Sequence, residues 1–232
     1  MKTCTLSYIN EEYPPPYKYH FEAVINLQSG ETTIKQHYLD RATLEMAEIE
    51  EAGFSQNDDF SWKGHLEGNW IAYLDHLVTK YSMVSNGSGK IVYGGSGQEV
   101  EVFPNNLDME MLIQAMIQAV LEGKAEELPL SVGVQLQDAA KPYMLNIRFK
   151  TLDASVQLPE GSIKQTDWDA TLQFVQSIYM SDFDEYASSS HKPMQGKFCI
   201  SLEPEVWLYA DEALEKRNKF PDFGAAFRKL LL

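Results

Sequence analysis

The residues best suited to acid–base chemistry in this 232-residue chain surround His76. Asp75 directly precedes this histidine, and Tyr73 and Glu67 come three and nine residues before it. A histidine next to a carboxylate can transfer a proton near neutral pH. His65 lies 11 residues before His76, about three helical turns, so the two rings share a face if one helix includes both. These residues support an alternative hypothesis, an enzyme or small-molecule binder with its site between the two halves of the chain.

Other patterns of reactive residues have simpler explanations. The glycine-rich segment 85–97 lacks the spacing of a phosphate-binding loop, and hairpin turns explain its glycines. The acidic groups at 167–169 and 182–185 could ligate a divalent cation, but neither has the twelve-residue calcium loop. We interpret the first group as acids at a helix start and the second as a solvated loop. The histidines lack zinc-protease spacing, so we expect no metal and no cofactor.

The two cysteines, Cys4 and Cys199, are far apart in the chain. A secreted domain usually carries a denser, even set of cysteines, so we expect reduced thiols and a cytoplasmic protein. Cys199 lies in a predicted buried strand, whereas Cys4 is expected to be more exposed. The chain begins without the apolar run of a signal peptide, and no segment approaches the length of a membrane span.

Charge is the most unusual property of the composition. The chain has 34 acidic and 19 basic residues, a formal net charge of −15. Residues 1–127 account for −12 of this total and residues 128–232 for −3. A strongly negative surface repels nucleic-acid phosphates and anionic membranes, so we exclude both as partners. It attracts basic macromolecules instead.

The segment 48–62 combines this charge with large aromatic rings. Aromatic residues among charged ones are typical of protein interfaces, where rings anchor the partner and charges steer it. We therefore predict a non-catalytic module that binds a basic protein, of the immunity, inhibitor or adaptor type. The alternative is an acidic solvated loop whose rings pack into the core. The predicted partner-binding residues are Glu48, Glu50, Glu51, Asp58, Asp59, Phe60 and Trp62.

Two further surfaces are weaker candidates. The prolines at 14–16 could present a polyproline segment to a partner, although a stiff lead-in to a strand is the simpler interpretation. In the last predicted helix, apolar residues form a stripe flanked by cations: Phe220, Phe223, Phe227 and Leu230. This stripe could contact the acidic half or a second subunit, but packing within its own domain is the simpler expectation.

The periodicity of apolar residues predicts strands and helices in both halves. In the first half we expect hairpins at 17–38 and 90–103, the latter with its turn at 94–97, and helices at 41–52, 66–81 and 107–122. Asp40 is the predicted cap of the helix 41–52, Gly53 ends it, and 54–63 is predicted to be a loop. In the second half we expect strands at 130–136, 143–149, 152–158, 197–202 and 206–209, and helices at 167–179 and 220–231.

The two halves also share short sequences. Ile-Lys-Gln occurs at 34–36 and 163–165, and each copy is followed by Ala-Thr-Leu, at 42–44 and 170–172. Such a repeat is consistent with an internal duplication. We predict an α+β protein of two ββα-rich halves, mainly antiparallel sheet covered by helices on one face. The predicted domains are 1–127, with the order ββααββα, and 128–232, with the order βββαββα; the two may be packed as one globular unit.

Overall fold

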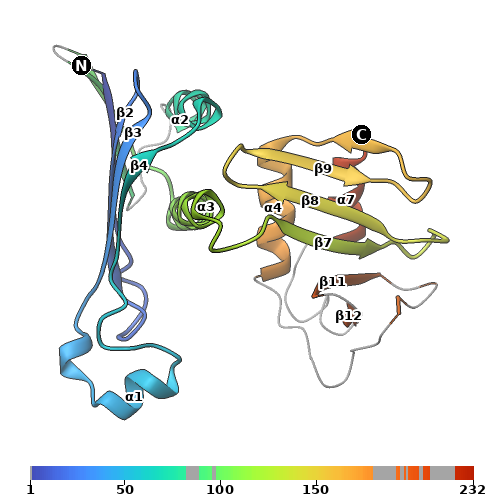
Figure 1. The fold of residues 1–232 in the computed structure, drawn as a ribbon, viewed down its shortest axis with the longest axis horizontal. Coiled ribbons are helices and arrows are strands. Elements are labelled where there is room, and N and C mark those ends of the chain that lie inside the picture. The colour runs from blue at the N-terminus through green and yellow to red at the C-terminus, as the bar shows by residue number, and fades with distance from the viewer. Residues whose placement is uncertain are drawn as a thin grey trace. The chain divides into compact units, whose positions relative to one another are not determined.

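A computed structural model describes residues 2–81, 89–95, 98–179, 192–193, 196, 198–203, 206–209 and 223–232. The chain divides into two compact units, Met1–Val120 and Leu121–Leu232. Each unit contains one six-stranded antiparallel sheet with helices on one face (Figure 1). The predicted α+β class, with two similar halves, is therefore confirmed.

The sheet of the first unit, sheet A, has the strand order β4-β3-β2-β1-β5-β6. Its strands are β1 (Thr3–Ile9), β2 (Tyr19–Asn26), β3 (Glu31–Tyr38), β4 (Phe60–His65), β5 (Lys90–Gly95) and β6 (Gln98–Val102). Two helices lie over one face, α2 (Gly68–Tyr81) and the N-terminal part of α3 (Asn106–Lys124) (Figure 1). A 3-10 turn, η1 (Arg41–Thr43), and the short helix α1 (Met46–Glu51) lie in the connection from β3 to β4.

The core of the first unit follows from strand alternation. Successive side chains of a strand point to opposite faces, so every second residue of β1 and β2 faces the helices. Six of these seven residues are fully buried and Tyr19 is half-buried, and Trp70 and Leu74 of α2 are buried against this face. The opposite face carries charges that pair across the strands, Lys63 with Glu31 at 3.0 Å and Lys90 with Glu101 at 2.8 Å.

The sheet of the second unit, sheet B, has the order β10-β9-β8-β7-β11-β12. Its strands are β7 (Leu130–Gln135), β8 (Tyr143–Arg148), β9 (Asp153–Gln157), β10 (Ile163–Gln165), β11 (Cys199–Glu203) and β12 (Val206–Tyr209). Helices α4 (Trp168–Tyr179) and α7 (Phe223–Leu230) cover one face. Asp167 caps α4 by accepting a hydrogen bond from the Ala170 amide at 2.8 Å, which confirms the predicted helix-start acid.

The C-terminal helix packs inside its own unit. The Phe227 ring lies 5.2 Å from Phe174 of α4 and 5.5 Å from Tyr143 of β8, centroid to centroid. Phe223 stacks on Phe198 at 5.7 Å. The simpler expectation for this stripe is confirmed for these residues, and Phe220 lies outside the described residues. In the described part of the chain, no helix has the length and apolar character needed to cross a bilayer.

The two sheets have the same connectivity. In sequence order, β1–β6 and β7–β12 occupy equivalent places, and one helix follows the fourth strand and another the sixth. The connection between the second and third strands has four residues in each unit, 27–30 and 149–152, and the one after the fourth strand has two, 66–67 and 166–167. The matching tripeptides do not mark this equivalence, because 34–36 lies in β3, a third strand, and 163–165 is β10, a fourth strand.

Several elements differ from the prediction. Strands β1 and β10 were not predicted, and β4 replaces part of the predicted loop 54–63. The predicted helix 41–52 is instead η1 followed by α1, because Asp40 has a left-handed backbone (φ 60°) and its side chain caps nothing. Ala42 and Met46, predicted to face inward, are exposed, whereas Ile49 is buried as predicted. Gly53, at φ 81°, follows the end of α1. The hairpin turn at 94–97 and the acids at 182–185 lie partly or wholly outside the described residues.

Candidate functional site

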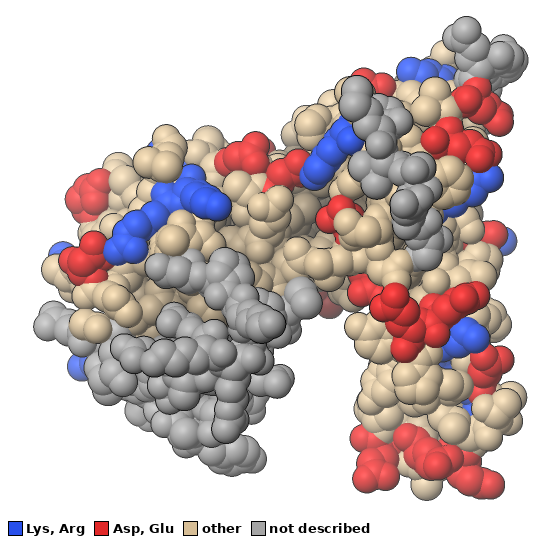
Figure 2. Space-filling model, turned by 180° about the vertical axis from the view of Figure 1, so that it is seen from behind, with Lys and Arg blue, Asp and Glu red and all other residues tan. Residues whose placement is uncertain are grey.

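The acidic residues of α1 form a protrusion from one end of sheet A. Glu48, Glu50 and Glu51 are all exposed on this helix. Glu48 also accepts a hydrogen bond from the Glu45 amide at 2.9 Å, which fixes the start of α1. Acidic side chains gather over this end of the first unit in the space-filling view (Figure 2). These three predicted partner-binding residues are therefore brought together.

Asp58, by contrast, is bound to a cation of the same unit. The side chain of Arg41 is only 4% exposed, and its Nη1 donates to Asp58 Oδ2 at 2.9 Å. Asp58 also accepts from the Ser55 amide at 2.7 Å and from the Ser55 hydroxyl. The hydrogen bonds from Ser55, followed by those from Arg41, lower the pKa of Asp58. Its role in the structure is to hold the connection 39–59 together.

The Arg41 side chain joins this connection to the preceding loop. Its Nε donates to the Pro16 carbonyl at 3.0 Å and its Nη1 to the Ser55 carbonyl at 2.7 Å. The guanidinium carbon also lies 4.5 Å from the centroid of the Phe54 ring, and Phe54 meets Tyr17 edge to face at 5.5 Å. Segments 10–18 and 39–59 are thereby fixed as one surface.

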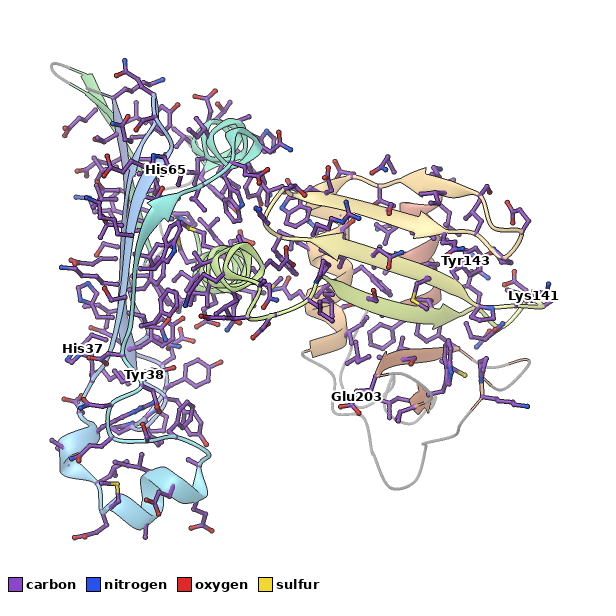
Figure 3. All side chains as sticks on the ribbon, viewed as in Figure 1. His37, Tyr38, His65, Lys141, Tyr143 and Glu203 are labelled. Atoms are coloured by element: carbon purple, nitrogen blue, oxygen red, sulfur yellow. The ribbon has the colours of Figure 1, made fainter. Side chains whose placement is uncertain are left out.

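Asp59 is also engaged within the unit. It contacts His37 Nδ1 through Oδ2, and its Oδ1 accepts from the Tyr38 amide at 3.0 Å. The Tyr38 hydrogen bond and the His37 contact lower the pKa of Asp59. Figure 3 shows His37 and Tyr38 at this end of β3, and His65 near the other end of the sheet.

Phe60 and Trp62 do not join the exposed acids. Both lie on β4 and alternate with Ser61 and Lys63, and Trp62 pairs with the buried Ile34 of β3 on the helix-covered face. The alternation in 60–65 was the sequence signal for a strand. Both rings are half-buried, and their contact with a partner stays a prediction.

The exposed rings at this end come from a different segment. Tyr13 and Tyr17 flank the three prolines and are 47% and 44% exposed. The prolines lack amide donors for a sheet ladder, which keeps both tyrosines in the loop between β1 and β2. The three consecutive prolines at 14–16 are the sequence signal for this loop.

We define the acidic end as segments 10–18, 39–59 and 103–110. All three lie at the same end of sheet A, because Ile9 pairs with His20, Tyr19 with Tyr38 and Ile91 with Val102. The acidic end holds eleven acidic and two basic residues. Both cations are already paired, Lys18 with Asp40 at 3.2 Å and Arg41 with Asp58. In the described part of the chain, eight carboxylates of the acidic end form no ion pair with lysine, arginine or histidine: Glu11, Glu12, Glu45, Glu48, Glu50, Glu51, Asp108 and Glu110.

A partly buried polar cluster lies where the acidic end meets α3. The Tyr8 hydroxyl donates to Glu110 Oε1 at 2.9 Å, and Asn106, one helical turn earlier, donates to Glu12. Desolvation raises the pKa of Glu110, the Tyr8 hydrogen bond partly offsets this rise, and the charge of Glu12 adds to it. Desolvation also raises the pKa of Tyr19, with a contribution from Glu110. None of these residues was predicted as a site.

The residues of the alternative hypothesis lie on α2, at the end of β4 and in the connection between them. The Asp75 carboxylate accepts a hydrogen bond from the Tyr93 hydroxyl, and Tyr73 stacks on His76 at 6.4 Å. His65 ends β4 and precedes α2, so it does not share a helical face with His76. Among the described residues, no group of three or more histidine, cysteine, aspartate or glutamate side chains is placed to hold a metal ion.

Comparison with protein-family models, with curated proteins and with solved structures found no match for this chain.

Proposed function

We propose that this protein is a non-catalytic module that binds a basic protein through the acidic end of sheet A. The observation that carries this proposal is the set of eight carboxylates that have no lysine, arginine or histidine partner in the described part of the chain. Elsewhere in the same unit, charges on the open face of sheet A pair with each other. Negative potential left uncompensated at one place steers a cationic partner toward it.

The comparison between the two units supports this choice of surface. The connection between the third and fourth strands has 21 residues in the first unit, 39–59, and five in the second, 158–162. Two other connections have equal lengths in both units. Loops on a fixed scaffold are the usual carriers of binding function. The extended connection and the acidic charge coincide, which favours recognition as the purpose of both.

The surface is also ordered before any partner arrives. Arg41 links the Pro16 carbonyl, the Ser55 carbonyl and Asp58, so the two loops share one anchor. A preorganised surface loses less conformational entropy on binding. Tyr13 and Tyr17 supply exposed rings beside the carboxylates, as expected of an interface in which aromatic residues anchor and acids orient the partner.

We also propose a cytoplasmic location and an internal duplication. Cys4 and Cys199 are both buried and form no disulfide with each other, as expected in a reducing compartment. The shared strand order and the equal connection lengths support a duplicated unit whose first copy acquired the acidic connection.

The test compares two variants with the same change in charge. Glu50→Lys/Glu51→Lys alters α1, whereas Glu127→Lys/Asp153→Lys alters exposed acids of the second unit. A partner captured from native lysate at low salt is purified, and its association rate with each variant is measured at low and high ionic strength. We expect the association rate of the α1 variant to fall by up to about tenfold relative to wild type at low salt. The difference in rate between this variant and wild type should shrink at high salt.

The control variant should associate at nearly the wild-type rate. Equal rates for both variants, or a captured partner whose binding is independent of salt, would contradict the proposal.

A further inference from the structure

The polar cluster beside α3 contains a buried acceptor without a donor. The Asn10 side chain is 4% exposed, and its Oδ1 accepts no hydrogen bond from any residue that the structure describes. Buried polar atoms in folded proteins nearly always have a partner, so an exception calls for a physical reason. Bound ligands are one such reason, because a binding site must keep some of its polar atoms for the ligand.

The alternation of β1 directs Asn10 toward the carboxylates. The Asn10 amide donates to the Tyr19 carbonyl at 3.0 Å, which extends the pairing of β1 with β2 by one residue. Asn10 therefore points to the same face as Tyr8, and α3 covers this face. Tyr8 contacts Glu110 of that helix, and the Asn10 amide group lies beside the Tyr19 hydroxyl. The orphan acceptor thus belongs to the same cluster as Glu110.

The cluster is rich in acceptors and negative charge. Glu110 receives one hydrogen bond, from Tyr8, and the nearby charge of Glu12 disfavours its ionised form. Two carboxylates and one amide oxygen therefore face few donors. A cation with several N–H groups satisfies such a site, because it supplies both the missing charge and the missing donor. The ring of Tyr19, which meets Tyr8 edge to face at 6.1 Å, adds a surface that attracts organic cations.

We propose that Asn10, Glu12 and Glu110 bind one cationic side chain of the basic partner, a lysine ammonium or an arginine guanidinium. This inference rests on the proposed function and names the contact that anchors the partner. An organic cation fits this site because its N–H groups can donate to several acceptors at once and the Tyr19 ring adds a surface that attracts it. The N–H groups donate to Asn10 Oδ1 and to Glu110, while Glu12 contributes charge.

The test uses a small probe and needs no partner. n-Butylammonium chloride, a mimic of the lysine side chain, is titrated into the full chain and followed by NMR of backbone amides and of the Asn10 side-chain amide. Sodium chloride at equal ionic strength is the reference. We expect saturable shifts at residues 8–12, 19 and 106–110. Glu110→Gln keeps an acceptor for Tyr8 and removes the charge, so it should weaken probe binding about tenfold or more.

Glu99→Gln is the matched control, because it removes one exposed carboxylate of the first unit outside the acidic end and should leave probe binding unchanged. Unaltered spectra of sheet A in the Glu110→Gln variant establish that it is folded. Shifts that never saturate and match those in sodium chloride overturn the inference, and so does equal probe binding by Glu110→Gln and wild type. In either case, a partner that still depends on Glu50 and Glu51 leaves the proposed function intact.

Discussion

The guanidinium carbon of Arg41 lies 3.6 Å from the centroid of the Tyr38 ring. This contact places a buried cation against an aromatic face in the most acidic part of the chain, with Asp58 hydrogen-bonded to the same guanidinium. The arginine neutralises one carboxylate and leaves those of α1 to the solvent. Arg41 therefore links segments 10–18 and 39–59 while pairing with only one of the carboxylates of the acidic end.

Arg41→Met should destabilise the acidic end by about 2–4 kcal/mol, because the change removes the donors to Asp58, Ser55 and Pro16 from a buried position. Hydrogen exchange of residues 39–59 measures the effect. Lys18→Met is the control, since the Lys18–Asp40 pair is partly exposed and contributes about 1 kcal/mol or less. Similar protection in both variants would show that Arg41 has no special structural role.

Gly30→Ala should destabilise the first unit more than Gly53→Ala. Both glycines have a positive φ, 74° and 81°, which costs a non-glycine residue about 1–2 kcal/mol. A Cβ at Gly30 would lie 2.7 Å from the Leu66 carbonyl oxygen, whereas a Cβ at Gly53 meets nothing within 4 Å. Urea unfolding of the two variants isolates the clash from the backbone strain. Equal losses would mean that the 66–67 connection moves to make room.

Glu110→Gln should make the stability of the first unit less dependent on pH. The folded protein raises the pKa of Glu110 through desolvation, so the unfolded chain releases this proton first as the pH rises. Wild-type stability is therefore lost between the ordinary glutamate pKa and the raised folded value. The glutamine variant lacks this loss and should gain stability relative to wild type above that window. Thermal unfolding from pH 4 to pH 8, with Glu51→Gln as the control, tests the sign.

Cys4 should resist alkylation in the folded protein. Burial in the core face of β1 raises the pKa of its thiol to about 12, so almost no thiolate is present near neutral pH. Iodoacetamide labelling, with site-resolved mass spectrometry, should be slow in buffer and fast in denaturant. Rapid labelling under native conditions would contradict the placement of Cys4 in the sheet. The expectation that Cys4 is more exposed than Cys199 is wrong, because Cys4 lies on the buried face of β1.

Local patterns in the sequence predicted most of the fold. The alternation in 17–27 and the apolar stripe in 66–81 correspond to β2 and α2. Alternation is equally present in β1, where Cys4, Leu6 and Tyr8 are buried between polar residues, so the sequence carries the signal for this strand as well. In β4, the acidic flank suggested a loop although ring and polar residues alternate.

The acidic end could not be predicted in the same way, because it depends on which strand ends meet. Glu12 and Glu110 are 98 residues apart in the chain and interact only because β1 and α3 meet at one end of the sheet. Arg41, which pairs with Asp58, directly follows a left-handed turn at Asp40, and no helix cap pattern indicates that turn. The sequence shows the negative charge of 48–62, but it does not show that Asp58 pairs with Arg41 and Asp59 with His37.

The 21-residue connection 39–59 is a long insertion between the two strands of the β3–β4 hairpin. The connection joins β3 to β4, and the pair of residues nearest to it in the β3–β4 ladder is Gln36 and Phe60. The second unit spans the corresponding gap with five residues. The length and sequence of the β3–β4 connection can therefore change while the register of the two strands stays the same. A change of binding specificity at this position would leave the sheet unaltered.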